Sequence, residues 1–221
     1  MLAAVLLMLP LVSFAHEAPL RYDRVHLSAR AQTQIENDTI IATLYAQQEG
    51  RDTVQLANLV NQQINKAIEY LKQHAAIKVQ TSSYTTSPVY QSNKITGWRV
   101  RQSIRLESQD MALMSSVLGE LQQTLALQGI TFAVSPELKN STDDELISEA
   151  LNAFEQRAKN ITQQLGRKNY KIVDINIVTS GDGLIRRNYE AAAMASKVAA
   201  PAIEAGERTL QVTVNAEIEL E

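Results

Sequence analysis

The segment VHLSARAQTQIENDTIIATLYA, residues 25–46, decides how the rest of the chain is interpreted. Apolar and polar side chains alternate over residues 25–36 and again over residues 40–46. A period of two is typical of a β-strand with one buried face and one wet face. Asn37 and Asp38, between the two runs, have turn chemistry. The segment therefore predicts two strands joined as a β-hairpin.

Several later stretches alternate in the same way and predict further strands. They are residues 77–79, 98–107, 130–134, 173–177 and 210–221. Between them, apolar residues recur at steps of three and four, which predicts three helices with one apolar stripe each. The first two begin after the capping residues Asp52 and Asp110. The third is predicted to begin at Thr142, in a capping box with Glu145, and to end at Gly166.

The strands and helices together predict the fold class. Nearly every strand has one apolar flank, and each helix has a single apolar stripe. This combination predicts an α+β domain, in which long helices pack on one face of an antiparallel or mixed β-sheet. We expect residues 25–221 to form a single domain with a long connection at 181–206. A strand–helix–strand order also occurs twice, which leaves two related modules open as an alternative.

A hydroxyl-rich stretch, residues 81–97, interrupts this regular pattern. It contains Ser, Thr, Asn and Pro88, the residue types of surface loops. We predict a long excursion between paired strands that projects beyond the body of the sheet. Tyr84, Tyr90 and Trp98 either cover the base of this excursion or face a partner. The stretch is the candidate interaction surface of the chain.

Two rows of opposite charge follow two of the predicted strands. The first row is Arg99, Arg101 and Arg105, and the second is Glu217, Glu219 and Glu221. If the two strands are neighbours, the rows form a cross-strand charge ladder, which is the interpretation we favour. If they are not, each row is available to a partner subunit of opposite charge, or is simply a solvated face.

Motifs for catalysis and for cofactors are missing from the sequence. The chain has no cysteine, and its three histidines do not have the spacing of metal ligands. It contains no Gly-x-Ser-x-Gly elbow and no P-loop. The acidic run 143–145 fits the first turn of the third helix, where acids stabilise the helix dipole. We expect no enzyme activity, no metal and no cofactor. The net charge of −3 argues against a nucleic-acid partner.

The first residues predict export. Residues 2–12 are apolar but too short to span a bilayer, and small residues at Ser13 and Ala15 fit a signal-peptidase site. We predict a signal peptide at 1–15, cleaved after Ala15, and a flexible N-terminus at 16–24. A buried N-terminal helix is the alternative. No second apolar run predicts a membrane anchor, so we expect a periplasmic or secreted protein.

Three stretches resemble the SIMPL-domain (DUF541) family, which includes a bacterial periplasmic immunogenic protein. Within residues 77–106, IKVQTSSYTTSPVY and ITGWRVRQSIRL are similar to its Thr-x-x-Tyr, Pro-x-Tyr and Gly-aromatic segment. Residues 147–168 resemble its alanine-spaced helix closing in Leu-Gly, and residues 201–220 its valine-rich last strand. The chain departs from the family at SARA, residues 28–31, where glycines are usual, and at Ala205, where proline is usual.

The resemblance implies an exported α+β domain with no established reaction and no catalytic residue to transfer. Family members look like assembly-forming proteins, one with a ring-like or channel-like oligomer, and others are linked to stress tolerance. Our leading hypothesis is therefore a non-enzymatic homo-oligomer. The alternative is a binding module for a small molecule or envelope polymer, with Arg186 and Arg187 of the connection as candidate contacts and the ligand unknown.

Overall fold

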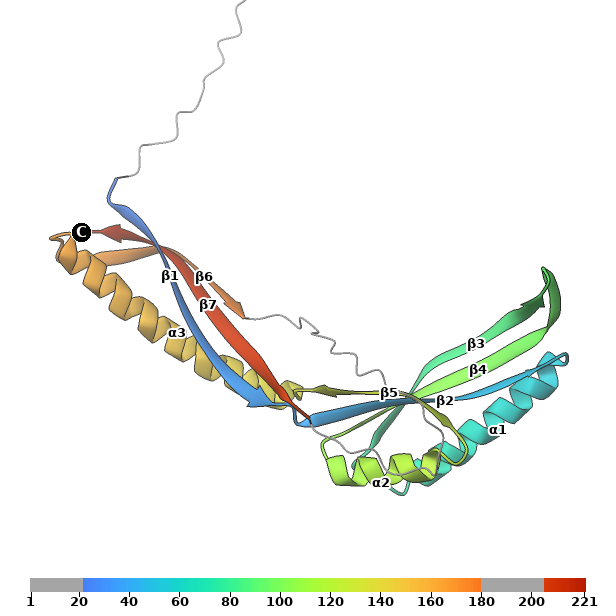
Figure 1. Cartoon of the computed structure of the whole chain (residues 1–221). Helices are drawn as coiled ribbons and strands as arrows, with labels where there is room; N and C mark the ends of the chain where they lie inside the picture. Colours follow the sequence, from blue (N-terminus) through green and yellow to red (C-terminus); the bar gives the residue numbers. More distant parts are fainter. Residues whose placement is uncertain (1–21, 180–204) are drawn as a thin grey trace, which may run out of the picture.

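The computed structural model describes residues 22–179 and 205–221, which form two layered lobes (Figure 1). The first lobe is a sheet of order β1-β7-β6, made of β1 (Arg24–Glu36), β7 (Glu207–Leu220) and β6 (Tyr170–Thr179), with helix α3 (Pro136–Gln164). The second is a sheet of order β3-β4-β2-β5, made of β3 (Lys78–Gln91), β4 (Lys94–Ser108), β2 (Thr39–Gly50) and β5 (Ala126–Ala133), with helices α1 (Thr53–Leu71) and α2 (Met111–Leu121). All strand pairs are antiparallel. The predicted α+β class is confirmed.

The predicted hairpin at 25–46 is wrong. β1 pairs along its whole length with β7, the last strand, whereas β2 pairs with β4 and β5 of the other sheet. Asn37 and Asp38 form the crossing between the lobes. The amide group of the Asn37 side chain donates to the carbonyl oxygens of Ala205 and Gly206, at 2.8 and 3.1 Å. Their polar groups therefore serve contacts between distant segments and not a tight turn.

Each lobe has its own hydrophobic core. In the first lobe, α3 covers β1 and β7, and Phe154 lies at the centre with 1% of its surface exposed. In the second, α1 and α2 cover one face of the sheet around Leu44, Ile64 and Met114. The other face of each sheet carries most of its polar side chains. Helices on one face only, as predicted, leave two open sheet faces.

Helix α3 begins earlier than predicted. Ser135 is its cap, its hydroxyl accepting from the Leu138 amide, and Pro136 occupies the first turn, where proline is well tolerated. Thr142 lies inside the helix, and its hydroxyl donates to the Leu138 carbonyl at 2.8 Å. The predicted capping box is therefore wrong, because the helix begins at Ser135, seven residues before Thr142. Gly166, with φ of +70°, ends the helix as predicted.

The signal peptide predicted at 1–15 lies outside the described residues. So do the greater part of the predicted flexible terminus at 16–24 and nearly all of the connection at 181–206, with Arg186 and Arg187.

Candidate interaction surface

The hydroxyl-rich stretch is a β-ribbon with two register shifts, between Thr81 and Ser83 and between Val89 and Tyr90, and not a loop. β3 and β4 pair from Lys78 opposite Glu107 to the last pair, Gln91 opposite Lys94. The ribbon closes at Ser92 and Asn93, both with positive φ (48° and 64°), the conformation of a two-residue type I′ turn. Threonine and tyrosine favour strands, and exposed hydroxyls are satisfied by water. The prediction of a loop failed because polarity was given more weight than β-propensity.

The tip of this ribbon extends beyond the rest of the second sheet (Figure 1). β2 ends at Gly50, which pairs with Trp98, so residues 89–97 extend past the last pair between β2 and β4. Gly97 is needed at this point because a Cβ there would lie 2.9 Å from the Gly50 carbonyl oxygen. The ribbon and the end of β2 are therefore in close backbone contact at the base of the tip.

The predicted aromatic residues divide between the base and the tip. Trp98 is half-buried and packs against the core of the second lobe, with Pro88 opposite it on β3. Tyr84 and Tyr90 expose 48% and 62% of their surface, and Ile95, opposite Tyr90, exposes 52%. The tip thus presents apolar surface that the second lobe does not cover.

Two of the predicted arginines form ion pairs on the open face of the second sheet. Arg99 lies 2.5 Å from Glu49 of β2, its cross-strand partner, and Arg105 lies 2.8 Å from Glu107 of its own strand. Both pairs are substantially exposed, so each contributes at most about 1 kcal/mol. In the described fold, both arginines pair with carboxylates of their own sheet.

Arg101 lies between these two pairs and has partners of a different kind. Its guanidinium carbon stands 3.6 Å above the centre of the Tyr45 ring, a cation–π arrangement. The same guanidinium donates to the Gln128 side chain at 2.7 Å and so ties β4 to β5 across β2. The sequence patterns did not identify Tyr45 as a partner of Arg101. An aromatic residue on the polar flank of β2 was the feature that could have indicated it.

The predicted charge ladder is wrong. Arg99, Arg101 and Arg105 lie in the second sheet, whereas Glu217 and Glu219 lie in the first. In the first sheet Arg24 of β1 holds both glutamates, at 2.7 and 3.3 Å. The hydrogen bond that the Arg24 guanidinium donates to Glu217 raises the pKa of Arg24. A charge pattern shows whether a strand carries positive or negative side chains, but it does not identify the neighbouring strand.

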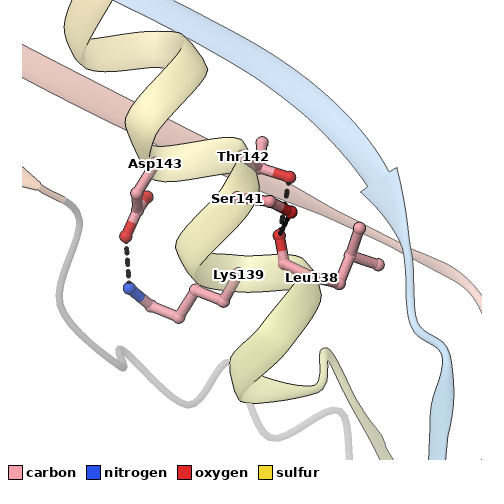
Figure 2. A network of polar contacts seen from close by, with 5 residues as sticks. All are labelled: Leu138, Lys139, Ser141, Thr142 and Asp143. Atoms are coloured by element: carbon pink, nitrogen blue, oxygen red, sulfur yellow. Dashed lines mark hydrogen bonds and ion pairs between the residues drawn. The ribbon is translucent and has the colours of Figure 1, made fainter.

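The acidic run 143–145 is also placed differently from the prediction, inside α3 and not in its first turn. Asp143 is buried, and one of its carboxylate oxygens forms an ion pair with the Lys139 ammonium group at 2.6 Å (Figure 2). Its other oxygen has no hydrogen-bond partner among the described residues. A buried carboxylate with one cation nearby is a feature that affects stability strongly.

The apolar edge strand β6 was missed as a surface. Its exposed side chains, each with 39–48% of its surface accessible, are Ile172, Val173, Ile175, Ile177 and Val178. The signal was present in KIVDINIVT, residues 171–179, where apolar residues occupy both flanks of the strand. Such a pattern is typical of a strand covered on both faces. In the described structure α3 covers one face only in part, and the apolar side chains of both faces remain substantially exposed.

The described residues contain neither a metal-binding cluster nor a membrane-spanning helix. Within residues 22–179 and 205–221, no three His, Asp or Glu side chains gather as a metal would require. None of the helices in those ranges is both long enough and apolar enough to cross a bilayer.

The two antiparallel sheets, each with helices on one face, define a layered α+β protein whose exposed features are a projecting ribbon and an apolar edge. The model of the SIMPL family, described as a protein of unknown function (DUF541), matches residues 25–218. The chain therefore belongs to the SIMPL family. A search among curated proteins finds no significant match.

Proposed function

We propose that this SIMPL-family protein is an exported, non-enzymatic protein that self-associates in the periplasm or outside the cell. The observation that carries the proposal is the β3–β4 ribbon, where Tyr84 along its length and Tyr90 and Ile95 at its tip are about half exposed or more. Tyrosines and isoleucines on a projecting ribbon offer contact area that a monomer leaves in water. Export rests on the signal-peptide pattern at 1–15.

A role in envelope or oxidative stress tolerance is part of the proposal and rests on the family resemblance alone. A strain lacking the protein would then lose viability in peroxide or envelope-damaging detergent. Normal survival of that strain in both conditions would remove this part.

Light scattering coupled to gel filtration tests the self-association. The purified protein is expected to elute as an oligomer that dissociates on dilution. Changing Tyr84→Ser, Tyr90→Ser and Ile95→Thr together is expected to shift it toward the monomer. The matched control is Thr85→Ala with Ser87→Ala, two exposed β3 residues on the alternate flank. A native protein that stays monomeric at every concentration would remove the proposal.

A binding module is the second candidate, and a recess on the open face of the first sheet favours it. The recess has a volume of about 380 Å³ and collects amide, imidazole and carboxylate groups suited to a polar ligand. Its lining residues are His26, Leu27, Ser28, Asp174, Asn176, Asn215, Ala216 and Glu217.

Titration calorimetry with peptidoglycan-derived oligosaccharides tests this candidate. Saturable binding that is lost in Asn215→Ala would support it, with Gln32→Ala on the same sheet as the control. Absence of binding to those sugars, together with oligomers that respond to the ribbon variants, would favour self-association.

A further inference from the structure

The edge strands of the two sheets differ in how they are protected. An exposed edge offers unpaired backbone groups to other strands, and proteins usually block it with charge, proline, bulges or a covering side chain. β3 carries Pro88 and a register shift between Thr81 and Ser83. β5 has only eight residues, and its register with β2 shifts between Thr43 and Leu44.

The two edges of the first sheet contrast most sharply. On β1, Arg157 of α3 reaches over and donates to the Ser28 backbone carbonyl, which covers part of that edge. On β6, by contrast, the edge contains no proline, and its charged side chains are Lys171 and Asp174 alone. A shift in register between Ile172 and Asp174 leaves residues 174–179 as a regular run.

Helix α3 covers the apolar flank of β6 only in part. Ile175 and Ile177 lie opposite Ala216 and Val214 of β7, so the four residues share the face that α3 packs on. The β7 residues expose 6% and 0% of their surface, whereas Ile175 and Ile177 expose 41% and 39%. The apolar face of the sheet therefore continues past its helix to an open edge.

We propose that β6 pairs antiparallel with β6 of a second copy of this chain about a twofold axis near Asn176. This inference rests on the proposed self-association and adds a second contact surface to the ribbon. The pairing would join the two first-lobe sheets into one of order β1-β7-β6-β6-β7-β1. Both copies of α3 would lie on the same face, because directly opposed residues of antiparallel strands share a face.

The sequence of the regular run is self-complementary in this register. Counting outward from the axis, Asn176 faces its own copy, and Ile175 of each strand faces Ile177 of the other. The two isoleucine pairs lie on the helix-covered face and extend both cores, whereas the paired amides lie on the open face and can hydrogen-bond. Asp174 faces Val178. The pairs formed by residues 174–178 of the two copies need no β-bulge.

The charges on β6 favour the same antiparallel orientation of two copies. Among its ten residues, the charged side chains are Lys171 and Asp174. A parallel pairing in register would place each beside its like, which destabilises a strand pair. The antiparallel pairing separates the two aspartates and leaves them on the open face. An isologous contact of this kind closes as a dimer.

Single-cysteine cross-linking tests the proposal. The chain has no natural cysteine, so the introduced thiol is the only one that can form a disulfide. Asn176→Cys places a thiol on the proposed axis, where opposed residues are within disulfide reach. Ser28→Cys is the matched control, because Ser28 occupies the same cross-strand row through Asn215 but on the β1 edge. Under mild oxidation we expect a covalent dimer for Asn176→Cys and a monomer for Ser28→Cys.

A charge substitution provides an independent readout. Ile177→Lys is expected to weaken association at least about tenfold in light scattering. Gln32→Lys, the same charge on the β1 edge, is expected to leave association unchanged, and circular dichroism checks that both variants fold. A native oligomer with no Asn176→Cys cross-link, or with an unchanged mass in Ile177→Lys, overturns the β6 pairing but not self-association. A monomeric native protein overturns both.

Discussion

The Asp38 carboxylate accepts two hydrogen bonds from Ser135, one from the backbone amide at 2.6 Å and one from the hydroxyl at 2.5 Å. Asp38 lies between the strands that begin the two lobes, and Ser135 caps α3, the helix of the first lobe. The same carboxylate accepts from the Thr39 hydroxyl at 3.0 Å. One side chain therefore fixes the junction through which the chain passes from lobe to lobe.

Removal of this carboxylate is expected to destabilise the protein. Asp38→Ala leaves the Ser135 amide without its acceptor, and a hydrogen bond to a charged group contributes about 1.5–3 kcal/mol. We expect the free energy of unfolding in urea to fall by about 1–3 kcal/mol. Asp144→Ala, an exposed aspartate of α3, is the control and should change it by less than about 0.5 kcal/mol. Equal effects for the two would contradict the role of Asp38.

The same contact predicts a dependence of stability on pH. Partial burial raises the pKa of Asp38, but hydrogen bonds from Ser135 and Thr39 outweigh it, and the net pKa lies below the ordinary value. The unfolded state therefore takes up this proton first as the pH falls. The stabilisation is complete above the unfolded pKa of about 3.9 and is lost as the pH falls through the folded pKa.

Urea unfolding of Asp38→Asn at several pH values checks this sign. The variant cannot ionise at position 38, so its stability should fall less steeply than that of the native protein below about pH 4. Parallel curves for the two proteins would show that Asp38 does not contribute to the acid sensitivity.

Two glycines provide a matched pair of substitutions. Gly97→Ala would place a Cβ 2.9 Å from the Gly50 carbonyl oxygen, a backbone atom that cannot move away cheaply. We expect it to lower the melting temperature, with a cost of about 1–3 kcal/mol. Gly119→Ala lies inside α2 with open space around the new methyl group, and should stabilise by about 0.5–1 kcal/mol. Thermal unfolding measures both, and a change of the same sign in the two variants would contradict the described packing at Gly97.

The buried pair in α3 predicts a strong non-additivity. Lys139→Met removes the cation from Asp143 and leaves a buried carboxylate unpaired, at an expected cost of about 2–4 kcal/mol. Adding Asp143→Leu removes the charge as well and should recover more than half of that loss. Chemical denaturation of the two single variants and the double variant completes the cycle. Additive losses would show that the two side chains do not interact.

Sequence patterns predicted the faces of strands well and their partners poorly. Alternation in residues 25–46 states that two strands have a buried flank, and both do. It carries no information on which strand lies alongside, because β1 pairs with β7, 171 to 195 residues further along the chain, whereas β2 pairs with β4 and β5 of the second sheet. The helix caps at Asp52 and Asp110 were predictable because capping is local: both side chains accept from first-turn amides.

The surface residues follow the same division. The exposure of Tyr84 and Tyr90 was predictable from their hydroxyl-rich neighbourhood. The partial burial of Trp98 agrees with its place on the apolar flank of the predicted strand 98–107, whereas its position at the base of the tip depends on where β2 ends. The apolar edge of β6 was visible as isoleucine and valine on both flanks, but only the sheet order shows that Ile175 and Ile177 lie beyond the helix that covers β7.

Sedimentation velocity of the purified native protein, from nanomolar to high micromolar concentration, tests self-association most directly. We expect a concentration-dependent oligomer whose mass is an even multiple of the protomer mass, as a closed β6 pair requires. A single monomer boundary at every concentration would contradict it.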